Sequence, residues 1–247
     1  MDVVNQPAPW IEDRWPMDPA QVRSIVLVLH GGQARSPTTV RRRTQLSYLR
    51  MVPFARFLHR RDGGHGMSVR ILRYRFRGWD EPERHPVQDA RWALAQLRDQ
   101  HRDAPVALLG HSMGGRAALR VADHPAVAAV CALAPWTTDG EPVQQLAGRS
   151  VLIAHGDRER TTDPRLSFRF AVRAKQITTR VCRFDVLGDG HAMLRRAHDW
   201  ALLAARFVEG ELGVQPPDPL IEDAMRRPVP DGLRVPLPVL TPGSMKW

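Results

Sequence analysis

A serine between two glycines is the feature of this chain best suited to chemistry. Residues 110–114 read Gly-His-Ser-Met-Gly, follow the apolar run 105–109 and precede a helical pattern over 114–123. A G-x-S-x-G segment between a strand and a helix forms a sharp turn. Side chains at its flanks would clash there, and the serine hydroxyl stands clear of the sheet. We therefore expect Ser112 to be a nucleophile.

A serine hydroxyl needs a base to take its proton, and His191 is the best placed of the ten histidines. It follows the strand-like run 180–187 within Gly188-Asp189-Gly190-His191, and an amphipathic helix is predicted after it over 197–208. The chain order nucleophile, acid, histidine suits a serine at the top of an open α/β sheet. The alternative is a solvated histidine in a glycine turn, and we favour the base.

The acid must accept a hydrogen bond from the imidazole and hold its tautomer. The apolar run 150–154 ends in His155-Gly156-Asp157-Arg158-Glu159, and the loop that leaves it also holds Asp163. Asp157, Glu159 and Asp163 all lie in the expected region. Spacing alone does not separate them.

An oxyanion forms on the substrate when a serine attacks a carbonyl, and it needs donors already in place. The amide of Met113, directly after the serine, is the first donor expected. The glycines of His30-Gly31-Gly32 follow the strand-like run 24–29 and allow the backbone to approach a substrate closely. An ordinary glycine turn is the alternative interpretation of that segment.

These segments together resemble the small bacterial serine hydrolases of the α/β-hydrolase superfamily. The matching residues are 29–32, 110–114, 155–159 and 190–191, and they lie within about residues 25–208. The resemblance implies that the acid stands three residues after the glycine of a His-Gly turn, which is Glu159 here, where Asp is commoner. Asp157 therefore remains the second candidate. The resemblance also implies that the second oxyanion amide belongs to Gly32, with Gln33 next in line.

Alternating strand-like and helical segments predict one α/β domain over residues 1–209. Strict alternation favours a mostly parallel sheet of about six strands with helices on both faces. Family members commonly begin with an antiparallel hairpin, but four prolines in the first 23 residues disfavour it. The strand at 69–76 should then lie at or near an edge. The expected strands are 25–29, 69–76, 105–109, 127–133, 150–154 and 180–186, and the expected helices are 44–60, 86–101, 114–123, 164–176 and 197–208.

The family's strand order places the run at 150–154 between those that hold Cys131 and Cys182. Strands two positions apart are about 9–10 Å apart, which exceeds the reach of a disulfide. We expect both thiols to be free and buried.

Residues 210–247 form a separate, proline-rich zone with eight prolines between 216 and 242. We expect an extended or partly disordered tail, with a short helix within 218–226. The tail is a candidate arm for a homo-oligomer, although a loosely packed tail is favoured over that role.

The segment between Ala134 and Ser150 is too short for the helical lid of larger family members. Trp136 begins it, where loops of this architecture face the ligand crevice. We expect Trp136 to line the substrate pocket, or else to wedge the loop onto the core.

The charge of +10 rests on 34 arginines and only two lysines, which are spread along the chain. That skew is typical of a GC-rich genome, and no nucleic-acid module is recognisable, so we expect no nucleic acid as a partner. An acidic substrate or an acidic partner surface remains an alternative. No secretory leader or membrane-spanning stretch is evident, and we expect a cytoplasmic protein that does not bind a membrane. No metal-binding spacing occurs, so no metal and no cofactor are implied.

The sequence therefore predicts a cofactor-independent serine hydrolase acting on a small-molecule acyl substrate. The bond would be an ester, thioester or lactone, and the acyl group would pass through Ser112. Alternatives are a peptidase-type acyl hydrolase, or a binding protein of the same fold without catalysis.

Overall fold

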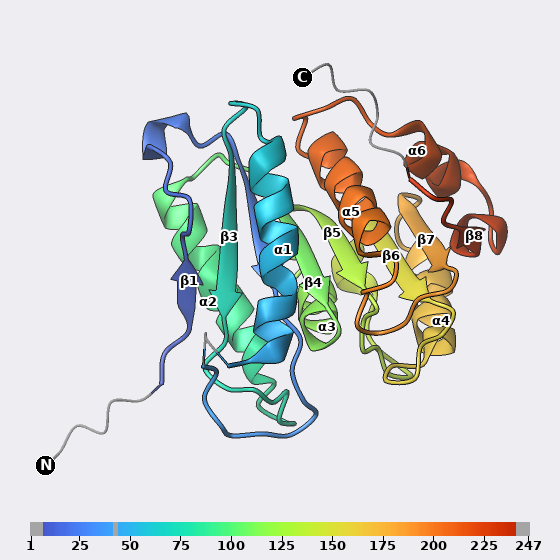
Figure 1. The fold of residues 1–247 in the computed structure, drawn as a ribbon, viewed down its shortest axis with the longest axis horizontal. Coiled ribbons are helices and arrows are strands. Elements are labelled where there is room, and N and C mark those ends of the chain that lie inside the picture. Colours follow the sequence, from blue (N-terminus) through green and yellow to red (C-terminus); the bar gives the residue numbers. More distant parts are fainter. Residues whose placement is uncertain (1–6, 42–43, 241–247) are drawn as a thin grey trace, which may run out of the picture.

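A single sheet forms the centre of the computed structural model, which describes residues 7–41 and 44–240. Its eight strands lie in the order β1-β3-β2-β4-β5-β6-β7-β8, and only β1 runs antiparallel to its neighbour (Figure 1). The strands are β1 Trp10–Glu12, β2 Ser24–Leu29, β3 Met67–Arg73, β4 Val106–His111, β5 Val127–Leu133, β6 Ser150–Gly156, β7 Val181–Val186 and β8 Val235–Pro236.

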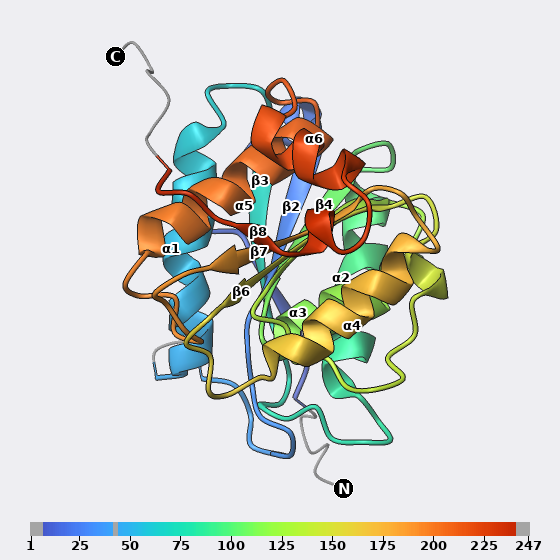
Figure 2. The same ribbon diagram turned by 90° about the vertical axis from the view of Figure 1, so that its right-hand side faces the viewer.

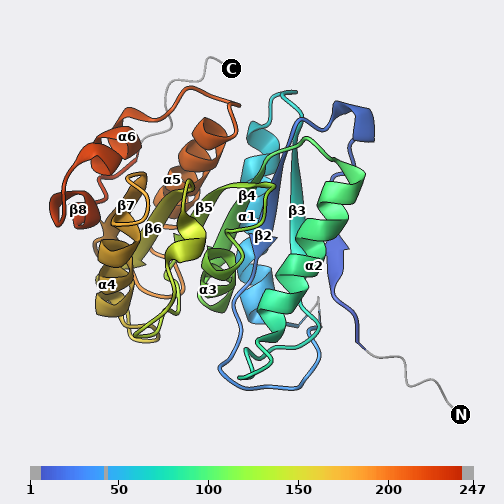
Figure 3. The ribbon, with the colours of Figure 1, turned by 180° about the vertical axis from the view of Figure 1, so that it is seen from behind.

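Helices cover both faces of this sheet. Helices α1 and α5 lie on the face turned to the viewer in Figure 1, and α2, α3 and α4 lie on the opposite face, seen in Figure 3. None of the helices in the described ranges is long and apolar enough to cross a bilayer. The helices are α1 Leu46–Arg61, α2 His85–Gln100, α3 Met113–Arg120, α4 Pro164–Lys175, α5 Ala197–Glu211 and α6 Pro219–Arg226.

The central strands are apolar along their whole length because both of their faces are covered. In β2, Val28 packs into the core beside α1 and α5, whereas Leu27 packs into the core beside α2 and α3. In β4, Leu109 packs into the first of these cores and Leu108 packs into the second. The alternation follows from the two-residue period of a strand, and continuous apolar runs are typical of parallel sheets.

The expected fold class is confirmed, since all six predicted strands and all five predicted helices are present. The sheet is larger than expected because β1 and β8 extend its two edges. Strand β1 pairs antiparallel with β3, so β3 is the second strand from the edge. Only three residues between Pro9 and Pro16 join the sheet, which is how a strand forms in a proline-rich segment.

The C-terminal segment is packed more closely than the proline pattern suggested. Helix α6 begins after Asp218, whose carboxylate accepts from the amide of Leu220, and β8 then pairs with β7 (Figure 2). Ile221, Met225 and Leu237 are buried in the core that α5 covers. Side chains before and after the expected boundary at residue 209 therefore pack into the same core. Residues 241–247 lie outside the described ranges.

The two cysteines lie on either side of β6, as expected. Cys131 and Cys182 both pair with Leu152 in the strand register, and both thiols are free and buried. Burial raises the pKa of each thiol well above its ordinary value. The strand order that we predicted for this part of the sheet is confirmed.

Candidate active site

Ser112 occupies the turn between β4 and α3 with a strained backbone. Its φ is 55° and its ψ is −119°, a conformation rare for a residue with a side chain. A Cβ on Gly110 would overlap the carbonyl of Gly114, and a Cβ on Gly114 would overlap the carbonyl of Leu29. Both flanks must therefore be glycine, and the turn presents the hydroxyl at the carboxyl end of the sheet.

The imidazole of His191 lies directly beside that hydroxyl. Nε2 of His191 is 3.1 Å from Oγ of Ser112, which is hydrogen-bond distance. His191 belongs to the loop between β7 and α5, and 22 % of its side chain is exposed. The loop thus brings His191 to Ser112 and leaves part of the ring exposed.

Glu159 completes the arrangement from the loop after β6. Its Oε2 is 2.8 Å from Nδ1 of His191, and its Oε1 accepts from the amide of Thr161 at 2.6 Å. Burial acts to raise the pKa of this carboxyl, but hydrogen bonds from His155, His191 and Thr161 outweigh burial and hold the pKa well below its usual range. Glu159 is therefore ionised and can fix the tautomer of His191.

The other two acidic candidates make different contacts. Oδ1 of Asp157 accepts from the amide of Gly188 at 2.7 Å. Asp163 caps α4 and accepts from the amide of Arg165 at 2.9 Å. The structure thus brings Glu159 to His191, and it assigns local backbone contacts to Asp157 and Asp163.

His155 supports the glutamate from within the sheet. Its Nε2 is 3.6 Å from Oε2 of Glu159, and its Nδ1 is 2.9 Å from the hydroxyl of Ser167. Burial lowers the pKa of His155, with hydrogen bonding to Glu159 acting in the opposite sense. His155 and His191 thus both contact Oε2 of Glu159 and hold that oxygen in place.

The amides of the expected oxyanion donors differ in whether they already have a backbone acceptor. The amide of Gln33 donates to the carbonyl of Arg77 at 2.8 Å, so it is occupied. Within residues 7–41 and 44–240, the amides of Gly32 and Met113 have no such acceptor. A Cβ on Gly32 would overlap both the carbonyl of Arg77 and the side chain of Met113, so Gly32 and Met113 pack closely. The geometry favours Gly32 over Gln33.

His30 orients the glycines that carry one of these amides. Its Nδ1 is 2.7 Å from the carbonyl of Gly31, and its ring makes T-shaped contacts with the rings of Tyr48 and Tyr74. Burial lowers its pKa to about 4, which keeps the ring neutral. His30 is therefore a structural histidine beneath the loop.

His111, which sequence reasoning did not single out, ties together the segments that carry Ser112 and His191. Its Nε2 is 3.0 Å from the backbone carbonyl of His191, and the two ring centroids are 4.8 Å apart. Only the position of His111 next to the serine could have drawn attention to it. The hydrogen bond spans 80 residues of sequence and is invisible to local patterns.

Trp136 packs against a buried arginine of the nucleophile helix. The guanidinium of Arg116 lies 4.1 Å from the ring centroid of Trp79 and 4.8 Å from that of Trp136, and it pairs with Glu141 at 2.7 Å. This contact corresponds to the second of our two expectations for Trp136, in which it packs the loop onto the core. The loop itself carries only the 3₁₀ turn Gln144–Leu146, and the amide of Trp136 donates to the carbonyl of Ser112 at 3.1 Å.

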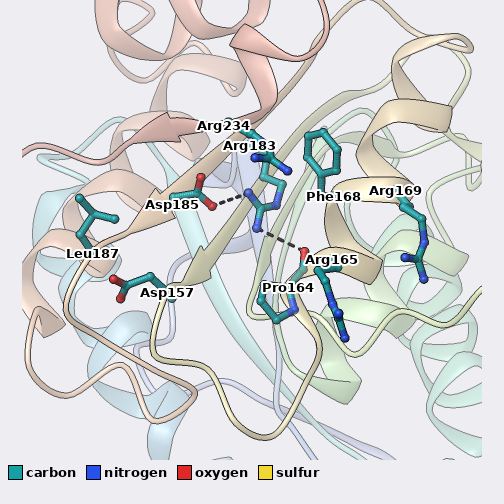
Figure 4. A pocket seen from close by; sticks show the side chains of 10 residues that line it. Asp157, Pro164, Arg165, Phe168, Arg169, Arg183, Asp185, Leu187 and Arg234 are labelled. Atoms are coloured by element: carbon teal, nitrogen blue, oxygen red, sulfur yellow. Dashed lines mark hydrogen bonds and ion pairs between the residues drawn. The ribbon is translucent and has the colours of Figure 1, made fainter.

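A separate hollow of about 380 Å³ lies between α4 and β7 (Figure 4). Its innermost group, Arg183, is 3 % exposed and is held by Asp185 at 2.5 Å and by the carbonyl of Leu233 at 3.2 Å. Ser112, Glu159 and His191 do not line it. This hollow therefore holds a structural ion pair rather than the candidate site.

The sequence profile of the Alpha/beta hydrolase family matches residues 25–244. The chain belongs to this family. No curated protein sequence matches the chain.

Solved structures with the same fold include two esterases. The butyrate-bound thermophilic esterase of Thermogutta terrifontis has a TM-score of 0.61 at 19 % identity and covers 85 % of this chain and 91 % of its own. An esterase of Pyrococcus furiosus has a TM-score of 0.61 at 14 % identity and covers 83 % and 87 %. A putative α/β hydrolase of unknown function from Agrobacterium tumefaciens has a TM-score of 0.59 at 18 % identity and covers 79 % and 89 %. At these identities the likeness shows the fold.

Proposed function

We propose that this protein is a serine hydrolase that cleaves an ester, thioester or lactone bond of a small-molecule acyl substrate. The observation that carries the proposal is the continuous path from Oγ of Ser112 to Nε2 of His191 at 3.1 Å and from Nδ1 of His191 to Glu159 at 2.8 Å. A nucleophile, a base and an orienting carboxylate in hydrogen-bond contact are the parts that acyl transfer needs. No cofactor is required for this chemistry.

In the first half of the reaction, Oγ of Ser112 attacks the carbonyl carbon while Nε2 of His191 takes the hydroxyl proton. The negative charge that develops on the carbonyl oxygen lies at the amides of Gly32 and Met113. When the tetrahedral intermediate collapses, the bond to the leaving group breaks and His191 returns its proton to that group. An acyl-enzyme on Ser112 and a free alcohol or thiol result.

In the second half, water replaces the alcohol. His191 takes a proton from the water as its oxygen attacks the acyl carbon, and the second intermediate collapses by breaking the bond to Oγ. The proton passes from His191 to Ser112, and the carboxylic acid leaves. One ester and one water are consumed, and one acid and one alcohol are formed. Glu159 stays ionised throughout and stabilises the imidazolium.

The structural neighbours support the esterase proposal through their own chemistry. The Thermogutta terrifontis esterase has been solved bound to butyrate and to propionate, and also phosphonylated by sarin. Those ligands belong to that protein. For this reason we choose short-chain esters as the first substrates to test on this chain.

The test is hydrolysis of 4-nitrophenyl butyrate by the wild-type protein and by the variants Ser112→Ala and His191→Ala. Each variant should lower kcat by several orders of magnitude. The double variant should lose little more, because the two residues act as a unit. A wild-type protein without turnover on esters and thioesters, or variants with losses of only a few fold, would contradict the proposal.

A further inference from the structure

A hollow of about 440 Å³ adjoins the candidate base His191. Two loops form it, the one after β6 and the one between β7 and α5. Three arginines from these loops line it, namely Arg158, Arg160 and Arg195, and all three are exposed. His191 borders this hollow and also contacts Oγ of Ser112 through its Nε2, at 3.1 Å.

The three guanidinium groups have no partner among the residues that the structure describes. This sets them apart from Arg116 and Arg183, which are buried and paired with carboxylates. Three like charges around one hollow repel one another, and that repulsion is relieved when an anion binds among them. Their exposure also keeps the desolvation cost of binding an anion low.

The backbone beside two of these arginines is fixed by the site itself. The amide of Arg158 donates to the carbonyl of Asp189 at 3.0 Å, and the amide of Arg160 donates to Oε1 of Glu159 at 2.8 Å. The carboxylate that orients His191 therefore also fixes the position of Arg160. These bonds fix the backbone from which the two side chains reach the hollow.

One carboxylate, Asp189, also lines the hollow, but its oxygens are turned toward other donors. Asp189 is 4 % exposed and accepts from the amide of Arg196 at 2.9 Å and from Nε1 of Trp200 at 3.1 Å. Glu159 is held by His191 at 2.8 Å. Three arginines and one aspartate line the hollow, so positive charge exceeds negative charge there.

A further positive charge acts on the site from helix α1. The field of Arg50 on α1 acts with burial and with His191 to lower the pKa of His111 to about 3. Arg50 has no ion pair within the described ranges. An anionic substrate approaching Ser112 would meet the field of Arg50 as well, and a favourable field raises the association rate.

We propose that the substrate is an ester that carries a carboxylate a few bonds from the scissile carbonyl, and that Arg158, Arg160 and Arg195 bind this carboxylate. This inference rests on the proposed hydrolase function and names its substrate class. Guanidinium groups match a carboxylate with two parallel hydrogen bonds. Leu194 lines the same hollow and is 61 % exposed, so it offers apolar contact to the short methylene chain between the two carbonyl groups.

The first experiment compares two substrates of the wild-type protein that differ by this charge. Mono-4-nitrophenyl glutarate carries the carboxylate, and 4-nitrophenyl pentanoate has the same chain length without it. The glutarate ester should have a kcat/KM at least about tenfold higher, and 0.5 M NaCl should reduce this advantage because exposed charges are screened. Equal kcat/KM values would overturn the inference and leave the hydrolase function intact.

The second experiment removes the three charges. In the triple variant Arg158→Gln, Arg160→Gln, Arg195→Gln, kcat/KM for the glutarate ester should fall at least about tenfold, chiefly through KM. The value for the pentanoate ester should change less than about threefold. An equal loss on both esters would show that the arginines act on the site in general, which would overturn their role in substrate binding.

A matched control separates local binding from overall charge. The triple variant Arg60→Gln, Arg102→Gln, Arg226→Gln removes the same net charge from exposed positions at the opposite ends of the strands. It should keep the preference for the glutarate ester. A loss of preference as large as in the first triple variant would assign the effect to net charge and contradict the proposed binding site. If neither ester is hydrolysed by the wild-type protein, the hydrolase function itself fails.

Discussion

His111 donates a hydrogen bond from Nε2 to the backbone carbonyl of His191, 3.0 Å away. The residue before the proposed nucleophile thus holds the loop of the proposed base. The ring is 5 % exposed, and burial lowers its pKa to about 3, so it remains neutral. Because Nε2 donates, the proton lies on Nε2 and Nδ1 carries the lone pair.

Replacing His111 tests whether this bond positions the base. His111→Leu removes the donor and should lower kcat by about tenfold or more, because small displacements of a base slow proton transfer strongly. His111→Gln supplies a side-chain amide near the position of Nε2 and should recover part of that loss. Steady-state kinetics of the two variants, with unfolding curves to confirm folding, measure the effect. Equal activity in His111→Leu and the wild type would refute the positioning role.

The choice of acid predicts a clear ranking of two variants. Glu159→Gln should lower kcat far more than Asp157→Asn, because only the carboxylate at 2.8 Å from Nδ1 of His191 fixes its tautomer. Asp157 contacts only the amide of Gly188 and should tolerate the change with a loss of a few fold. Measuring kcat of the two variants on one ester at one pH tests this ranking. The reverse ranking would transfer the role to Asp157.

Because His30 and His111 are buried, we expect acid to destabilise the fold. Burial lowers the pKa of His30 to about 4 and that of His111 to about 3, below the ordinary value of 6.5. Below pH 6.5 the unfolded chain binds protons that the folded protein does not. The free energy of unfolding should therefore fall by about 1.4 kcal/mol per pH unit for each such histidine until the folded pKa is reached.

Urea unfolding at pH 7 and pH 5 measures this loss. His111→Gln removes one of the titrating groups, so the difference between the two pH values should be smaller in that variant. The carboxyl of Glu159, whose pKa is also low, contributes only below its ordinary range and does not affect this interval. Identical unfolding free energies at pH 7 and pH 5 in the wild type would contradict the buried neutral state of these rings.

The short loop after β5 predicts kinetics without interfacial activation. Residues 134–149 carry one 3₁₀ turn and no helical lid. Hydrolysis of short soluble esters should exceed that of emulsified triglyceride, and the rate should not rise as a substrate passes its solubility limit. A sharp increase in rate at that limit would show that another segment opens over the site.

Sequence patterns predicted the elements that position the site because those elements are local. The strand, glycine turn and helix around Ser112 are contiguous in the chain, and so are the strand and loop that carry His191. The continuous apolar runs of the central strands predicted a parallel sheet covered on both faces, and that is the fold observed.

The details that sequence reasoning left open depend on contacts between distant residues. Glu159 and Asp157 are two positions apart, and only the path of the loop decides which of them faces His191. Gln33 is excluded as an oxyanion donor by its bond to Arg77, which lies 44 residues further along the chain. The prolines near β8 concealed a strand because only two residues there join the sheet.

The proposed function requires Ser112 to be a nucleophile that His191 activates. Labelling with a fluorophosphonate probe, followed by mass spectrometry of the peptides, tests it most directly. The wild-type protein should take up one probe per chain on the peptide that contains Ser112. Ser112→Ala should take up none, and His191→Ala should be labelled slower by several orders of magnitude, because the serine then lacks its base. An unlabelled wild-type protein, or a probe attached to a different serine, would contradict the account.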